Sequence, residues 1–205
     1  IERKKCWEHF LIPTYDWFVE DNLRYRRDRT PGGCYFFTLV TMDRQPLLTL
    51  PENLERLQQG FHFENQRRSF QIDGLIVLPD HLHCILKLPE NDDNYPVRIT
   101  NIKKFFSMGC KGISAEVTPS RRAKGEKPVW QRRYWEHRIR DQEDWRRHMD
   151  YIHYNPVKHG YVQSPLDWSS ITLKDCISKG WYPENWGESI DSERMKDFKI
   201  PGNYV

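Results

Sequence analysis

A period of two in the side chains of residues 81–88 constrains the fold more than any other feature of the sequence. Successive side chains of an extended chain point to opposite faces. One face of this segment is wholly apolar and consists of Leu82, Cys84, Leu86 and Leu88. The opposite face consists of His81, His83, Ile85 and Lys87. The pattern predicts a strand that lies on a hydrophobic core and carries two imidazoles side by side on its other face.

The histidine pair allows two interpretations. Two imidazoles on a rigid strand can direct their lone pairs at one metal ion. A short His-x-His motif also occurs as two ordinary polar residues on a solvated face. The pair by itself leaves both interpretations open.

The order of the other predicted elements indicates an α+β fold. Aromatic and β-branched residues at 34–42 and apolar runs at 69–78 predict strands, and residues 129–140 are assigned as a fourth strand. Apolar residues at helical spacing predict helices over residues 51–68 and 98–108. With the histidine strand, the order is β-α-β-β-α-β, the ferredoxin-like arrangement: an antiparallel sheet with both helices on one face. An additional helix follows at residues 144–155.

Length and composition fit one domain with extensions. A chain of 205 residues can bury a core, and 14% aromatic residues compensate for a hydrophobic fraction of 38%. We expect an extension at 1–30, a catalytic domain at 31–160 and a tail at 161–205 packed on it. No apolar run reaches the roughly 20 residues of a membrane span. We therefore expect a cytoplasmic protein that does not associate with a membrane. The five cysteines are scattered without a Cys-x-x-Cys pair, which argues against a disulfide framework or zinc ribbon.

Basic charge is concentrated in the middle of the chain. The net charge is +3, but residues 121–149 hold ten Lys or Arg against five Asp or Glu. Arginines that only solvate exposed faces would explain any single pair. Aromatic residues interleaved with them offer stacking surfaces for bases and favour nucleic acid as the partner. The predicted DNA contacts are Arg24, Arg26, Arg27, Arg132, Arg133 and Trp135.

The helix at 144–155 places two functional side chains on one flank. Its buried stripe consists of Trp145, Met149 and Ile152. Tyr151 lies about 130° from the middle of that stripe, and Asn155 lies about 40° from Tyr151.

Other readings of this helix remain open. Tyr151 can be a boundary packing residue, and Asn155 can be the terminator of a helix stopped by Pro156. Tyr154 falls near the solvent pole, about 100° from Asn155, and is the poorer candidate to act with it.

Two longer motifs resemble a known family. The sequence LPDHLH at 78–83, followed by DYIHYNPVKHG at 150–160, is similar to the single-tyrosine transposases with a His-hydrophobic-His motif. It looks most like the branch associated with repetitive extragenic palindromes (REP) of bacterial chromosomes. Further matches lie at residues 31–33, 102–105, 130–131 and 135–137. The resemblance spans roughly residues 25–186, so the first 23 residues and those after 186 are unassigned.

The resemblance implies a ferredoxin-like domain that cleaves and joins single-stranded DNA beside a hairpin. His81 and His83 would bind a divalent cation, and Asn155 would stand where relatives place a third polar ligand. Nitrogen and oxygen donors with open positions suit Mg²⁺ or Mn²⁺, and Zn²⁺ could also bind in the tube. Tyr151 would be the nucleophile and form a 5′-phosphotyrosine intermediate. A monomer is expected, with a homodimer as the alternative.

Two other functions are alternatives to this one. A non-catalytic hairpin-binding protein would keep the basic and aromatic surface without cleavage. A zinc hydrolase acting on a small molecule would need a third histidine or carboxylate close to the pair, which the sequence lacks.

Overall fold

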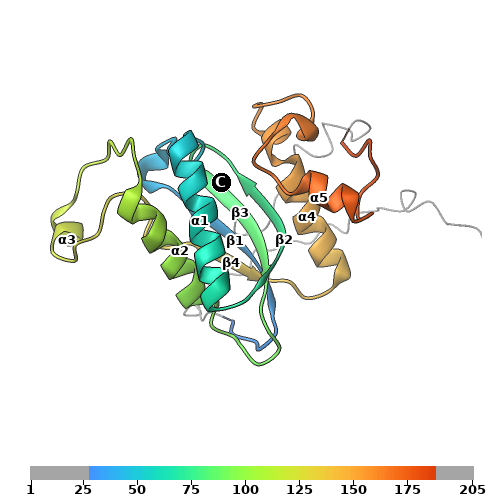
Figure 1. Ribbon diagram of the computed structural model, residues 1–205, viewed down its shortest axis with the longest axis horizontal. Coiled ribbons are helices and arrows are strands. Elements are labelled where there is room, and N and C mark those ends of the chain that lie inside the picture. Colours follow the sequence, from blue (N-terminus) through green and yellow to red (C-terminus); the bar gives the residue numbers. More distant parts are fainter. Residues whose placement is uncertain (1–27, 188–205) are drawn as a thin grey trace, which may run out of the picture.

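A four-stranded antiparallel sheet forms the centre of the molecule. The computed structural model describes residues 28–187. Its main elements follow the order β1 (Cys34–Val40), α1 (Pro51–Arg67), β2 (Gln71–Val77), β3 (His81–Lys87), α2 (Tyr95–Gly109), β4 (Trp135–Arg138) and α4 (Gln142–Lys158). The strand order across the sheet is β2-β3-β1-β4, with every neighbouring pair antiparallel. The predicted α+β, ferredoxin-like fold is confirmed (Figure 1).

Short helical segments connect or follow these elements. They are η1 (Met42–Arg44), α3 (Pro119–Arg122), η2 (Pro165–Asp167) and α5 (Leu173–Ser178). β2 and β3 form a hairpin in which the Leu78 amide donates to the His81 carbonyl over 2.9 Å. The fourth strand, Trp135–Arg138, is shorter than the strand predicted over residues 129–140. Trp130 pairs with Thr41 only as an isolated bridge, and the strand begins five residues later.

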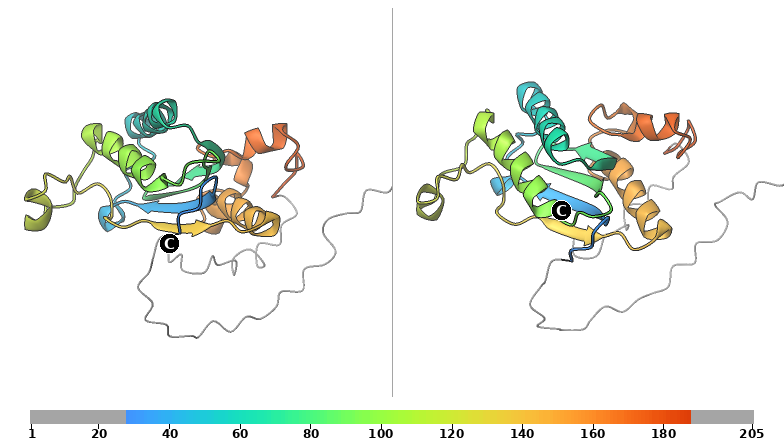
Figure 2. Two further views of the ribbon diagram at one scale, coloured as in Figure 1. Left: turned by 90° about the horizontal axis from the view of Figure 1, so that it is seen from below. Right: turned by 60° about the horizontal axis from the view of Figure 1, so that its bottom comes forward.

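One face of the sheet carries the main hydrophobic core. Helices α1 and α2 lie side by side over this face (Figure 2). Leu82, Cys84 and Leu86 of β3 point into this core with no exposed surface. Ile85 of the same strand belongs instead to a second apolar cluster on the opposite face. The alternation predicted for the histidine strand is therefore present.

Helix α4 packs directly on that opposite face. Met149 and Ile152 are fully buried there with Ile76 and Ile85. A Cβ atom added to Gly74 would lie only 2.6 Å from the Met149 sulfur, so the absence of a side chain lets helix and strand approach closely. This packing brings the helix against the strand that carries the histidines.

Helix α4 continues through its proline, contrary to the prediction. Asp141 caps its beginning by accepting the Asp144 amide over 2.8 Å. Pro156 removes one amide donor, but the His159 amide still donates to the Asn155 carbonyl over 3.0 Å. The helix ends at Lys158, and Gly160 then adopts a positive φ of 72°. Asn155 consequently keeps a helical position one turn after Tyr151.

The segment after α4 packs on the edge strand β2 and on helix α4. The Val77 amide donates to the Ser170 carbonyl over 2.9 Å, and the Thr172 amide donates to the Leu75 carbonyl over 3.0 Å. Tyr154 packs with Leu173 and Trp186 and is only 3% exposed. Its predicted place near the solvent pole is wrong, because this later segment buries that side of the helix.

Candidate metal and tyrosine site

The two histidines of β3 are buried and each is held by its Nδ1 atom. His81 and His83 are 1% and 0% exposed, with ring centroids 5.0 Å apart. The Nδ1 atom of His81 lies 2.7 Å from a carboxylate oxygen of Asp80. The Nδ1 atom of His83 lies 2.9 Å from the hydroxyl of Thr38. These positions exclude the interpretation of two residues on a solvated face.

Both Nε2 atoms are left buried without a hydrogen-bond partner among the described residues. Histidines that bind metals commonly use one ring nitrogen for the ion and donate the other to a carboxylate or another oxygen. Burial, followed in importance by the neighbouring His81, holds the pKa of His83 well below its usual value. The His83 ring is therefore neutral and its Nε2 lone pair can act as a ligand.

Asn155 adds a third buried polar side chain. It is completely buried, and apart from its interaction with the Tyr151 phenol its amide makes no hydrogen bond within residues 28–187. A buried polar group left unpaired costs about 1–3 kcal/mol. Such groups therefore point to an ion or ligand that would satisfy them. Two imidazole nitrogens and an amide oxygen form a mixed nitrogen and oxygen donor set that could hold a divalent cation.

Tyr151 lies against this histidine pair. Its ring centroid is 5.1 Å from that of His83, and the side chain is 3% exposed. Burial raises the pKa of the phenol, and the nearby amide of Asn155 opposes part of that shift. The Lys158 ammonium lies 4.7 Å from the centroid of the same ring. The phenol is protonated at neutral pH, so its use as a nucleophile requires local stabilisation of negative charge.

A row of aromatic rings leads from the histidines to the surface. The ring centroid of His159 lies 5.3 Å from that of His81, and the centroid of Tyr161 lies 6.0 Å from that of His159. The Trp168 and Tyr161 centroids are 5.4 Å apart, and the Tyr161 side chain is 44% exposed. Burial, with His81 next in importance, lowers the pKa of His159 to about 4. Neutral rings of this kind offer stacking surfaces beside the candidate site.

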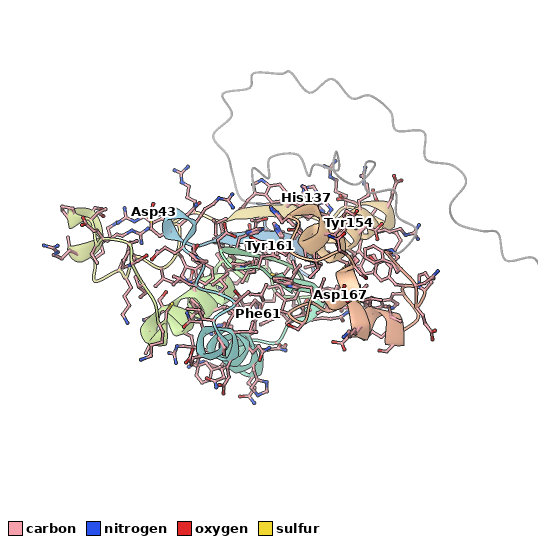
Figure 3. All side chains as sticks on the ribbon, turned by 90° about the horizontal axis from the view of Figure 1, so that it is seen from above. Asp43, Phe61, His137, Tyr154, Tyr161 and Asp167 are labelled. Atoms are coloured by element: carbon pink, nitrogen blue, oxygen red, sulfur yellow. The ribbon has the colours of Figure 1, made fainter. Side chains whose placement is uncertain are left out.

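A second polar cluster was missed by the sequence reasoning. His137 of β4 meets Asp144 and His148 of α4, and the candidate ligand atoms of all three lie within 4.8 Å of one another. In Figure 3, His137 lies on the side of the molecule opposite to Phe61 of α1. The four-residue spacing of Asp144 and His148, which places both on one helix face, was the available signal. The cluster could hold a metal ion.

The predicted DNA contacts are only partly described. Arg132 and Arg133 are exposed, and Arg132 forms an ion pair with Glu126 over 2.9 Å. The Trp135 ring is half-buried and stacks on His137 with 5.9 Å between centroids. Arg24, Arg26 and Arg27 lie outside the described residues. In the described part of the chain, no helix is long and apolar enough to cross a membrane.

The similar proteins and solved structures found for this chain include several of one kind. No protein-family model matches the chain. A protein of Haemophilus influenzae is 40% identical over 167 residues, which cover 82% of this chain and 94% of that protein. The REP-associated tyrosine transposase of Escherichia coli K12 is 38% identical over 166 residues, with 81% and 92% covered. A solved structure of a REP-associated tyrosine transposase bound to a REP hairpin has 39% identity and a TM-score of 0.66, covering 79% of this chain and 89% of that one.

Proposed function

Because the chain belongs to the REP-associated tyrosine transposases, we propose that it cleaves and rejoins single-stranded DNA beside palindromic hairpins through a covalent bond to Tyr151. One observation carries the proposal. The buried Nε2 atoms of His81 and His83 lack hydrogen-bond partners in the described chain, and the Tyr151 ring centroid lies 5.1 Å from that of His83, with the Asn155 amide beside the phenol. The hairpin in the solved relative supports the proposed substrate.

His81, His83 and Asn155 would hold a divalent cation, Mg²⁺ or Mn²⁺. When bound, such a cation polarises a non-bridging oxygen of the scissile phosphate. Asp80 and Thr38 orient the two imidazoles so that each presents Nε2 to the site. The buried strand beneath them keeps this arrangement rigid.

Tyr151 supplies the nucleophile. Its phenolic oxygen forms a bond to phosphorus while the bond from phosphorus to the 3′ oxygen of the preceding nucleotide breaks. The phenol loses its proton and the leaving oxygen gains one, giving a 5′-phosphotyrosine and a free 3′-hydroxyl. Lys158 places positive charge over the ring as the phenolic oxygen becomes anionic. A 3′-hydroxyl can attack the same phosphorus in reverse, so strand joining needs no external energy source.

The DNA would lie along basic and aromatic side chains. Arg132 and Arg133 are exposed and able to contact phosphates, and Trp135 offers a ring for base stacking. Arg24, Arg26 and Arg27 are proposed for the same role on the basis of sequence. Charge reversal at these arginines should weaken hairpin binding and flatten its dependence on salt concentration.

The decisive experiment compares two tyrosines of one helix. The parent protein, Tyr151→Phe and Tyr154→Phe are incubated with a labelled hairpin oligonucleotide and Mn²⁺ or Mg²⁺. Both tyrosines are 3% exposed, but Tyr154 packs in a separate cluster with Leu173 and Trp186. We expect a covalent adduct with the parent and with Tyr154→Phe, and none with Tyr151→Phe. Equal cleavage by Tyr151→Phe would refute the mechanism. Binding without an adduct for any metal or substrate would favour the non-catalytic alternative.

A further inference from the structure

The His137, Asp144 and His148 cluster links the edge strand β4 to the first turns of α4. The Nε2 atom of His137 lies 2.8 Å from one carboxylate oxygen of Asp144. The Nδ1 atom of His148 lies 3.2 Å from the other carboxylate oxygen and 2.8 Å from the Asp144 backbone carbonyl oxygen. The two imidazoles stack at 4.7 Å with an interplanar angle of 12°. One carboxylate therefore has an imidazole nitrogen at each of its oxygens.

We infer that His137, Asp144 and His148 form a second metal site, for a transition metal of the Zn²⁺ class. Two imidazole nitrogens and a carboxylate oxygen are a donor set used for Zn²⁺, with a fourth position left for water or a ligand. Ligand bonds of about 2.0–2.1 Å in a tetrahedral site separate the ligand atoms by roughly 3.3 Å. The ligand atoms of the three residues already lie within 4.8 Å of one another. Binding of an ion would replace the hydrogen bond between His148 Nδ1 and the Asp144 backbone carbonyl.

The surroundings of the cluster hold its side chains in place. His148 is 5% exposed, and its ring is enclosed between those of His137 and Phe36, with centroids at 4.7 and 4.9 Å. The Arg140 backbone amide donates to the Asp144 carboxylate over 3.0 Å, on the oxygen that also faces His137. The carboxylate is therefore held in one orientation by both β4 and the turn before α4.

This second site is separate from the one on β3. The Phe36 ring contacts both sites, with its centroid 4.9 Å from that of His148 and 5.3 Å from that of His83. His148 and Asp144 precede Tyr151 by three and seven residues, or about 4.5 and 10 Å along the helix axis. A cation at the cluster would attach α4 to β4 without occupying the position beside Tyr151. The inference does not depend on the proposed cleavage reaction.

Cobalt titration of the full chain tests this site. Co²⁺ replaces Zn²⁺ as a probe because its visible absorption reports the ligand set. We expect two Co²⁺ per parent protein, one for His137→Gln and one for the double variant His81→Ala/His83→Ala. Zn²⁺ affinity of the second site should fall in His137→Gln by more than the roughly 10- to 100-fold cost of losing an outer-shell partner. His153→Gln changes a buried histidine of the same helix outside the cluster and should still bind two ions.

The count of bound ions decides the outcome. One Co²⁺ per parent protein that disappears in the double variant overturns the inference, as does retention of two ions by His137→Gln. Circular dichroism of each variant checks its folding. Zn²⁺-induced shifts of the His137 and His148 imidazole signals in the parent protein give a second measurement that needs no variant. Unshifted signals at saturating Zn²⁺ would also overturn the inference.

Discussion

Substitution of Thr38 by valine tests how the histidine pair is held. Thr38 and His83 are 1% and 0% exposed, and the threonine hydroxyl lies 2.9 Å from the histidine Nδ1 atom. If His83 uses Nε2 for a cation, Nδ1 carries the proton and donates it to this hydroxyl. Valine has nearly the same shape but no acceptor, so the variant leaves a buried N–H group without its partner.

Two separate losses follow from that change. An unpaired buried donor costs about 1–3 kcal/mol, which should appear as a lower free energy of unfolding. Loss of an oxygen that orients a metal-binding histidine typically weakens metal affinity about 10- to 100-fold. The corresponding change in binding free energy is about 1.4–2.8 kcal/mol. Thr38→Ser keeps the hydroxyl and should retain nearly the parent affinity.

Calorimetric titration with Mn²⁺ and urea unfolding measure the two losses independently. We expect Thr38→Val to lose both Mn²⁺ affinity and stability, whereas Thr38→Ser loses only the packing of one methyl group. A Thr38→Val protein that is less stable but binds Mn²⁺ as tightly as the parent would show that the hydroxyl serves packing alone. The assignment of His83 as a ligand oriented by Thr38 would then be wrong.

Three further changes probe the helix that carries Tyr151. Burial raises the pKa of the Asp150 carboxyl to about 6. The contribution of this carboxyl to the free energy of unfolding is therefore complete below its ordinary pKa of about 4 and is lost as the pH rises through 6. Asp150→Asn should therefore raise the free energy of unfolding at pH 7 by up to about 3 kcal/mol and leave it little changed at pH 4, measured by urea unfolding at both values. Gly74→Ala would place a Cβ atom 2.6 Å from the Met149 sulfur and should destabilise the protein by about 1–3 kcal/mol in the same assay; an unchanged midpoint would contradict the close packing. Lys158→Met removes the ammonium 4.7 Å from the Tyr151 ring centroid and should move the pH–rate profile of adduct formation to higher pH, while Lys158→Arg should not.

The structure shows why some sequence predictions were right. Residues 81–88 alternate because one face of β3 meets the core under α1 and α2, and hydrophobic patterning reports that contact directly. The ferredoxin-like order followed from the lengths and periodicities of successive segments. Tyr151 and Asn155 share a helix turn, so local geometry was enough to place them together.

Other predictions failed where distant segments meet. Tyr154 is buried because residues from the segment after α4 cover it, and helical periodicity carries no information about that cover. Pro156 did not end α4, because hydrogen bonds on either side of the missing donor persist. The partnership of His137 with Asp144 and His148 depends on where β4 pairs with β1, which no local pattern reports.

The sequence by itself determined the strand that carries the histidines, the helix that carries Tyr151 and the family to which both motifs belong. Those features depend on the period of side chains along one segment and on contiguous motifs. Only the tertiary structure decided that α4 lies on the histidine face, that the Nε2 atoms are buried without partners in the described chain, and that Thr38 and Asp80 orient the rings. Burial and ring orientation arise from contacts between segments far apart in sequence, so they exist only once the sheet and helix have packed together.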